Sequence, residues 1–129
     1  MAIKVFIAYS FENKKEFISF NKSLKGFLEE NGFISYSFVF DFNGEIKNNK
    51  DLMDKALKKI DESKIVIAEL SYKRVGIGVE VGYAKAKGKK IIYIHQKGSD
   101  VSTTVDGVSD VRIDYKNIDD LFLKLKEIF

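Results

Sequence analysis

The chain has 129 residues, a formal net charge of +3, no cysteine and a single histidine, His95. This length fits one domain with one core, spanning 1–129. Without cysteine the chain has no disulfide, thiol nucleophile or thiolate metal site, and one histidine is too few for a multi-histidine centre, so we expect no metal and no cofactor.

Charge and hydropathy indicate which kinds of partner the protein can bind. Its lysines are interspersed with acidic residues, which favours a solvated surface over a nucleic-acid patch. No apolar run is long enough to span a bilayer, and the N-terminal segment lacks the long apolar run of a signal peptide. We therefore expect a cytoplasmic protein that binds neither nucleic acid nor membranes, while an anionic small molecule remains compatible with the charge.

Apolar runs of strand length alternate with amphipathic segments along the whole chain. We expect strands at 3–9, 33–40, 64–70, 89–95 and 111–115, and helices at 13–32, 50–63, 78–88 and 117–129. This alternation predicts right-handed βαβ units. The expected fold is α/β: a doubly wound, mainly parallel five-stranded sheet of the flavodoxin-like or Rossmann-like kind, with the first strand central and ligands at the carboxyl ends of the strands.

One carboxylate, Glu80, stands in the glycine-flanked apolar sequence GIGVEVG (76–82). A helix starting at residue 78 would place Glu80 in the first turn, where backbone N–H groups keep a carboxylate ionised. A rigid, ionised carboxylate suits a nucleophile in glycosidic bond cleavage. The alternative is a tight strand-to-helix turn that serves packing alone. The spacing of the glycines does not match the dinucleotide-binding fingerprint.

Three further polar residues stand at expected strand ends. Glu69, in KIVIAEL, is either a second active-site carboxylate that shares a cleft with Glu80 or an acid paired for structural reasons. His95 is more typical of a packed, hydrogen-bonded residue than of a catalyst. Ser10 precedes a helix start and could donate to a phosphate, although bulky and acidic residues follow it.

The segments KVFIAYS, KIVIAEL and GIGVEVGYAKAKGKKIIYI together resemble the nucleoside 2-deoxyribosyltransferase superfamily, and most of all its 2′-deoxynucleoside 5′-phosphate N-hydrolases. The resemblance implies cleavage or transfer at the N-glycosidic bond of a nucleoside or nucleoside 5′-monophosphate. In that chemistry Glu80 would be the nucleophile and Glu69 the second carboxylate. Substrate-binding roles would fall to Phe6, Ala8, Ser10, Gly76 and Gly78. The resemblance also implies a homodimer or higher homo-oligomer in which Ser102 contacts the substrate phosphate of the partner subunit.

The sequence departs from this family at two places. The family tends to carry an aspartate in the helix before KIVIAEL, and ungapped spacing from Glu80 puts Ala56 there; Asp54 lies about 200° away around the helix. The loop SFENKK also lacks the usual glycines. A degenerate member that binds a nucleotide without chemistry therefore stays open.

A second family offers another interpretation. VFIAYSFENKKEF is similar to the opening of a TIR domain, and IDESKIVIAELS fits the same pattern. That resemblance implies either an enzyme that cleaves NAD or a non-catalytic interaction module.

Overall fold

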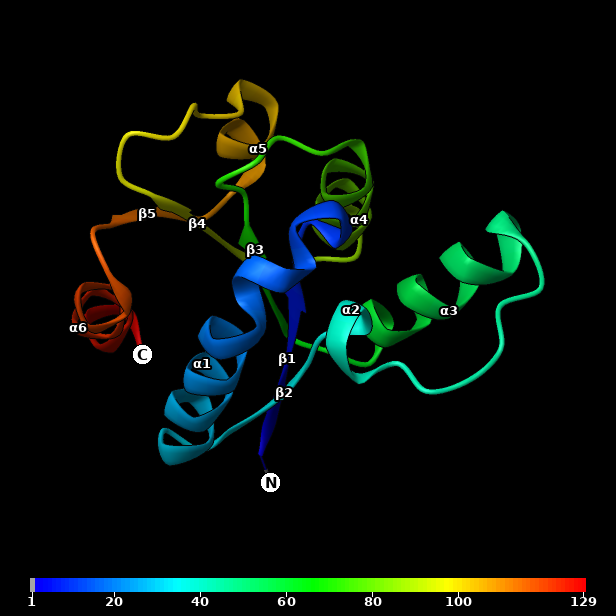
Figure 1. Cartoon of the computed structure of the whole chain (residues 1–129), viewed down its shortest axis with the longest axis horizontal. Coiled ribbons are helices and arrows are strands. Elements are labelled where there is room, and N and C mark those ends of the chain that lie inside the picture. The colour runs from blue at the N-terminus through cyan, green and yellow to red at the C-terminus, as the bar shows by residue number, and fades with distance from the viewer. Residues whose placement is uncertain (1) are drawn as a thin grey trace.

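The structure is a computed structural model that describes residues 2–129. Its centre is a five-stranded sheet (Figure 1) made of β1 (Ile3–Ala8), β2 (Phe33–Tyr36), β3 (Ile65–Glu69), β4 (Lys90–Gln96) and β5 (Val111–Tyr115). The strand order is β2-β1-β3-β4-β5 and every neighbouring pair is parallel. This is the flavodoxin-like order, which confirms the predicted fold class. The middle strand is β3, however, so the expected central position of the first strand is wrong.

Helices cover both faces of the sheet. They are η1 (Phe11–Phe17), α1 (Ile18–Glu30), α2 (Phe38–Asp41), α3 (Asn49–Asp61), α4 (Val75–Ala86), α5 (Thr103–Val108) and α6 (Ile118–Ile128). Successive strand side chains point to opposite faces, and the buried strands are apolar on both. One face packs against α1 and α6, and the other against α3, α4 and α5 (Figure 1).

Two segments differ from the sequence-based prediction away from the site. The aromatic run expected as a strand over 33–40 leaves the sheet after Tyr36 and turns into α2, where the backbone N–H of Ser37 donates to Asp41 Oδ2 at 2.8 Å. The predicted loop over 96–110 contains the short helix α5, which is capped because the Ser102 side chain accepts from the backbone N–H of Val105.

The start of α4 is the difference that matters for function. This helix begins at Val75, three residues earlier than expected, because Gly76 and Gly78 continue it rather than interrupt it. Glu80 therefore lies in the second turn of the helix. The N-terminal stabilisation expected for its carboxylate is wrong, since that effect fades beyond the first turn.

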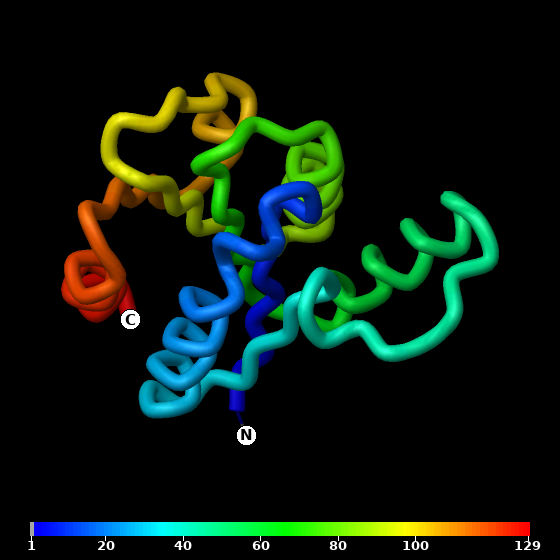
Figure 2. The backbone as a smooth tube through the Cα atoms, viewed as in Figure 1, coloured from blue at the N-terminus to red at the C-terminus, as the bar shows by residue number. Residues whose placement is uncertain are grey.

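The connection between α2 and α3 is long and irregular. Figure 2 shows it running outward to the N-terminal end of α3, after which α3 returns toward the sheet. The start of α3 is capped by Asn48, whose side chain accepts from the backbone N–H of Asp51 at 2.8 Å. This excursion supplies an apolar wall for the cavity described next.

Candidate active site

A cavity of about 930 Å³ opens at the carboxyl end of β1. Its walls come from the segment after β1, from α2 and the loop that follows, from α3, and from the N-terminal half of α4. In a sheet of this order, β1 and β3 flank the point where the winding direction reverses, and ligands bind there. The volume falls in the range of small-molecule sites, about 300–1,000 Å³.

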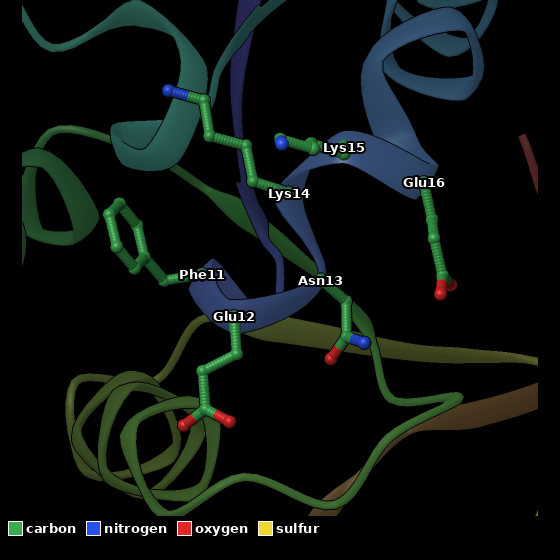
Figure 3. A pocket seen from close by; sticks show the side chains of 6 residues that line it. All are labelled: Phe11, Glu12, Asn13, Lys14, Lys15 and Glu16. Atoms are coloured by element: carbon green, nitrogen blue, oxygen red, sulfur yellow. The ribbon is translucent and has the colours of Figure 1, made fainter.

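A smaller cavity of about 410 Å³ follows η1 and shares Phe11, Glu12 and Lys14 with the larger one. In Figure 3, Glu12 extends toward α4, whereas Lys14 extends toward α2. The Lys14 ammonium lies 5.7 Å from the ring centre of Phe40 in α2. The segment η1 thus forms one rim of the larger cavity and connects it to α2 and α4.

Glu80 is the acid that α4 contributes to the cavity wall. Its side chain is half-buried, and within residues 2–129 no hydrogen bond or ion pair reaches its carboxylate. The neighbouring turns of α4 place Ile77 and Val81 in the core. Burial raises the pKa of Glu80 from 4.5 to about 7. Near neutral pH the carboxyl group is therefore present in both protonation states.

The start of α4 brings a positive charge to the cavity wall through Arg74, the N-cap of this helix. The Arg74 guanidinium donates from Nε to Ser10 Oγ at 3.2 Å and from Nη2 to Asn13 Oδ1 at 3.1 Å. It also lies 3.4 Å from Glu12 Oε2. Lys14 and Lys73 line the same cavity, and the first turn of α4 has no side-chain cap. Uncapped N–H groups together with cations make this end suited to an anion.

The remaining wall is apolar. It is formed by Phe38, Val39, Phe42, Ile46, Leu52 and Met53, together with Ala56. The ring centres of Phe38 and Phe42 lie 4.5 Å apart, and the two rings are tilted by 30° to each other, so they form a continuous aromatic surface. Ala56 faces the cavity, while Asp54 points to solvent and pairs with Lys50 at 3.7 Å. Although α3 is described over its whole length, it brings no carboxylate into the cavity.

Glu69 does not share this cavity. Its carboxylate is 1% exposed and accepts from the backbone N–H of Ser71 at 2.7 Å, from Ser71 Oγ at 2.8 Å and from the Tyr115 hydroxyl. Tyr115 belongs to the core under α1 and α6, whereas α4 covers the opposite face. Burial raises the pKa of Glu69, and these hydrogen bonds oppose the rise. The expectation that Glu69 and Glu80 open on one cleft is therefore wrong, because alternation along β3 sends Glu69 to the other face.

His95 is a packed residue. Its Nδ1 lies 2.9 Å from Ser99 Oγ and its Nε2 lies 3.5 Å from the Arg112 guanidinium. Burial, helped by the positive charge of Arg112, lowers the pKa of the imidazole. This geometry agrees with the interpretation favoured from the sequence.

The expected substrate-binding residues divide into two groups. Ser10 and Gly76 line the cavity, whereas Phe6, Ala8, Gly78 and Ser102 do not. Phe6 and Ala8 are buried in the core beneath α3 and α4, and Ser102 caps α5 in its own chain. Roles in substrate binding for these four residues stay predictions.

Sequence patterns do not single out several of the residues that line the cavity. The most prominent are Arg74 and Lys73, which stand just before the helix that carries Glu80, and Phe38 and Phe42, which were assigned to a strand and a loop. Two consecutive cations in SYKRVGIG, directly before a helix start, were a usable signal for an anion site. No comparable signal marks the two phenylalanines as cavity residues, because aromatic runs are equally typical of strands.

The family model for nucleoside 2-deoxyribosyltransferase matches residues 6–116. The chain therefore belongs to the nucleoside 2-deoxyribosyltransferase family, the first of the two families that its sequence resembles. One relative is the protein of Thermofilum pendens named "Putative 2′-deoxynucleoside 5′-phosphate N-hydrolase 1". It is 24% identical over 132 residues, which cover 95% of this chain and 92% of the relative.

Solved structures share the fold of this chain. The CMP N-glycosidase of Clostridium botulinum is 27% identical with a TM-score of 0.70, over 96% of this chain and 98% of that one. A 2-deoxyribosyltransferase from Bacillus psychrosaccharolyticus has the same fold at 16% identity and a TM-score of 0.70, over 92% and 90% of the two chains. A conserved protein of Enterococcus faecalis V583 shares the fold at 12% identity and a TM-score of 0.78, over the full length of both chains.

Family and relatives together support chemistry at the N-glycosidic bond, with a nucleoside or nucleotide as the small-molecule substrate. Among the helices of residues 2–129, none has both the length and the apolar character needed to cross a bilayer. Nor do these residues bring three potential metal-ligating side chains together.

Proposed function

We propose that this protein cleaves or transfers at the N-glycosidic bond of a nucleoside 5′-monophosphate, with Glu80 as the nucleophile. The observation that carries the proposal is the Glu80 carboxylate, which lies in the wall of a cavity of ligand size and has no hydrogen-bond or ion-pair partner among residues 2–129. A half-buried acid is costly unless it is paired or used. The names of two relatives, a 5′-phosphate N-hydrolase and a CMP N-glycosidase, point to the same bond in a nucleotide.

The chemistry requires the ionised form of Glu80. Its Oε attacks the anomeric carbon, a C–O bond forms, and the C–N bond to the base breaks. Water, or a second base in a transfer reaction, then attacks the same carbon and releases the carboxylate. The pKa of about 7 leaves a large ionised fraction near neutral pH. The apolar wall from α2 and α3 limits competing water around the reacting carbon.

The phosphate is proposed to bind at the Arg74 end. Arg74 would exchange its present contacts with Glu12 and Asn13 for contacts with phosphate oxygens, because a guanidinium forms bidentate hydrogen bonds with a phosphate. Gly76 lines the cavity, and apart from its own helix backbone and chain neighbours a Cβ built there would meet no atom of residues 2–129 within 4 Å. A ligand oxygen can therefore approach the free N–H groups of the first turn of α4.

Glu69 is proposed to have a structural role. Its carboxylate receives hydrogen bonds from Ser71 and Tyr115, and Ser71 Oγ also accepts from the backbone N–H of Gln96 at 2.9 Å. These contacts tie together the carboxyl ends of β3, β4 and β5. The network stabilises the edge of the sheet near the site without reaching the cavity.

A homodimer formed through α4 is proposed to complete the site. Val75 and Val79 on the outer face of this helix are 86% and 49% exposed. Glycine inside a helix costs about 1 kcal/mol relative to alanine. A Cβ added at Gly82 would meet no atom of residues 2–129 within 4 Å apart from its own helix backbone and chain neighbours, so packing among these residues does not explain this glycine. A partner helix against α4 would explain the apolar face, and would bring the partner's α5, with its Ser102, near the cavity.

The test is base release from a panel of nucleosides, nucleoside 5′-monophosphates and NAD, followed by chromatography. The wild type is compared with Glu80→Gln and with Glu127→Gln, a matched change at an exposed position of α6. The proposal requires release from a monophosphate by the wild type and by Glu127→Gln, with loss in Glu80→Gln. Binding of a nucleotide without release from any substrate would instead establish a degenerate, non-catalytic family member.

A further inference from the structure

The proton-donating groups that line the cavity are few. Glu12 is paired with Arg74 at the anion-binding end, and a guanidinium does not lose its proton in proteins. The Tyr9 hydroxyl donates to Asn21 at 2.9 Å, and burial keeps its pKa well above the ordinary value of 10.0. The Ser10 hydroxyl donates to Asn13 Oδ1 at 2.6 Å, and the Lys14 ammonium lies over the Phe40 ring of α2, 5.7 Å from its centre. Lys73 stands just before α4. Among residues 2–129, the α3 part of the cavity wall therefore brings no acidic side chain to a base that leaves toward it.

The wall that would receive the base is hydrophobic and aromatic. Leu52, Met53 and Ala56 come from α3, and Phe38 and Phe42 complete the surface with two rings 4.5 Å apart. A neutral nucleobase usually needs a proton or a hydrogen bond on a ring atom as it departs, because otherwise it leaves as an anion. None of these five side chains can donate a proton or a hydrogen bond, whereas aromatic faces attract a cation within about 6 Å of the ring centre.

The carboxylate of Glu80 gives a second, independent reason to expect a positively charged ligand. This carboxylate has no cation or donor within residues 2–129, so its ionised form is uncompensated in the free protein. A positive charge placed in the cavity favours ionisation of a nearby carboxylate. A cationic ligand would therefore produce the nucleophilic form of Glu80 when it binds.

On the basis of the proposed function, we infer that the preferred substrates are mononucleotides whose base is positively charged at or beside the glycosidic nitrogen. Such bases include a pyridinium or a ring-alkylated purine. The negative phosphate would lie toward Arg74 and the cationic ring between Glu80 and the Phe38–Phe42 surface.

The reaction balances without a proton donor. Glu80 Oε forms an ester bond to the anomeric carbon, the C–N bond breaks, and its electron pair neutralises the positive charge of the base, which leaves neutral. Water then adds to the same carbon, the carboxylate of Glu80 is restored, and one proton passes to solvent.

Two matched substrate pairs test the inference. They are 7-methylguanosine 5′-monophosphate against guanosine 5′-monophosphate, and nicotinamide mononucleotide against its reduced, uncharged dihydro form. General acid catalysis is worth about 10²–10⁴-fold. A site without the acid should therefore show kcat/KM at least about 100-fold higher for the charged member of a pair, after subtraction of the uncatalysed rate.

Ala56→Asp separates the effect of the site from the greater intrinsic lability of charged bases. A carboxyl group at this cavity position should raise kcat/KM for the neutral member and reduce the charged-to-neutral ratio at least tenfold. Asn49→Asp adds an acid at an exposed position of the same helix and should leave the ratio unchanged. If Ala56→Asp does not fold, the kcat/KM values of the wild type for the two substrate pairs still test the inference.

Neutral members cleaved as fast as charged ones, or an unchanged ratio in folded Ala56→Asp, would overturn the inference and leave the proposed function standing. Release of no base from either pair or from the wider panel would reject the proposed function, and the inference with it.

Discussion

Glu80→Gln removes a charge while it keeps the size and shape of the side chain. The amide cannot attack the anomeric carbon, and no other group occupies this position of α4. Loss of the nucleophile should lower kcat for base release by on the order of 10³-fold or more, equal to about 4 kcal/mol of barrier. Affinity for nucleotides with a neutral base should change little, because the phosphate contacts come from the Arg74 end of the cavity.

The same substitution should make the folded protein more stable at alkaline pH. The pKa of Glu80 rises from 4.5 to about 7 on folding, so the folded state binds the proton more tightly than the unfolded state. Stability from this group is present below pH 4.5 and is lost as the pH rises through 7. A shift of this size corresponds to at most about 3.4 kcal/mol. Because the side chain is partly open to the cavity, we expect Glu80→Gln to raise the free energy of unfolding by about 1–2 kcal/mol at pH 8.

The assay is urea unfolding of the wild type, Glu80→Gln and Glu127→Gln at several values between pH 4 and pH 8. The difference between wild type and Glu80→Gln should grow from pH 4.5 to pH 8, whereas Glu127→Gln should follow the wild type. In parallel, kcat/KM of the wild type should rise with pH through about 7 as Glu80 ionises. A Glu80→Gln protein that is less stable at pH 8 would refute the desolvation of this carboxylate, and retained turnover would refute its role as nucleophile.

Three further changes test other parts of the structure. Arg74→Ala should raise KM for monophosphates about 10- to 100-fold in initial-rate assays, because charge-assisted hydrogen bonds contribute about 1.5–3 kcal/mol. The same change should leave KM for unphosphorylated nucleosides unchanged. Tyr115→Phe removes a hydrogen-bond donor from the buried Glu69 and should lower the free energy of unfolding in urea by about 1–3 kcal/mol, with no change in kcat. A loss of kcat in this variant would instead indicate that Glu69 takes part in the reaction. Val79→Glu should convert the proposed dimer to a monomer in sedimentation, and a monomeric wild type at high concentration would contradict that interface.

The sequence by itself determined the order of the elements and the family. Continuous apolar runs such as IVIA in β3 can be buried only between two layers of helices, so a parallel sheet followed from local composition. The spacing between Ala56 and Glu80 was also informative. Counting along the sequence from Glu80 singled out Ala56, and both residues lie in the wall of one cavity.

Only the tertiary structure decided what these residues do. Whether Gly76 and Gly78 end or continue a helix depends on the packing of Ile77 and Val81 against the sheet, and that packing moved Glu80 from a stabilising helix terminus into a desolvating wall. The contact of Arg74 with Ser10 joins residues 64 positions apart in the chain. Local patterns carry no information about such pairs, because the contact exists only after β1 and β3 lie side by side.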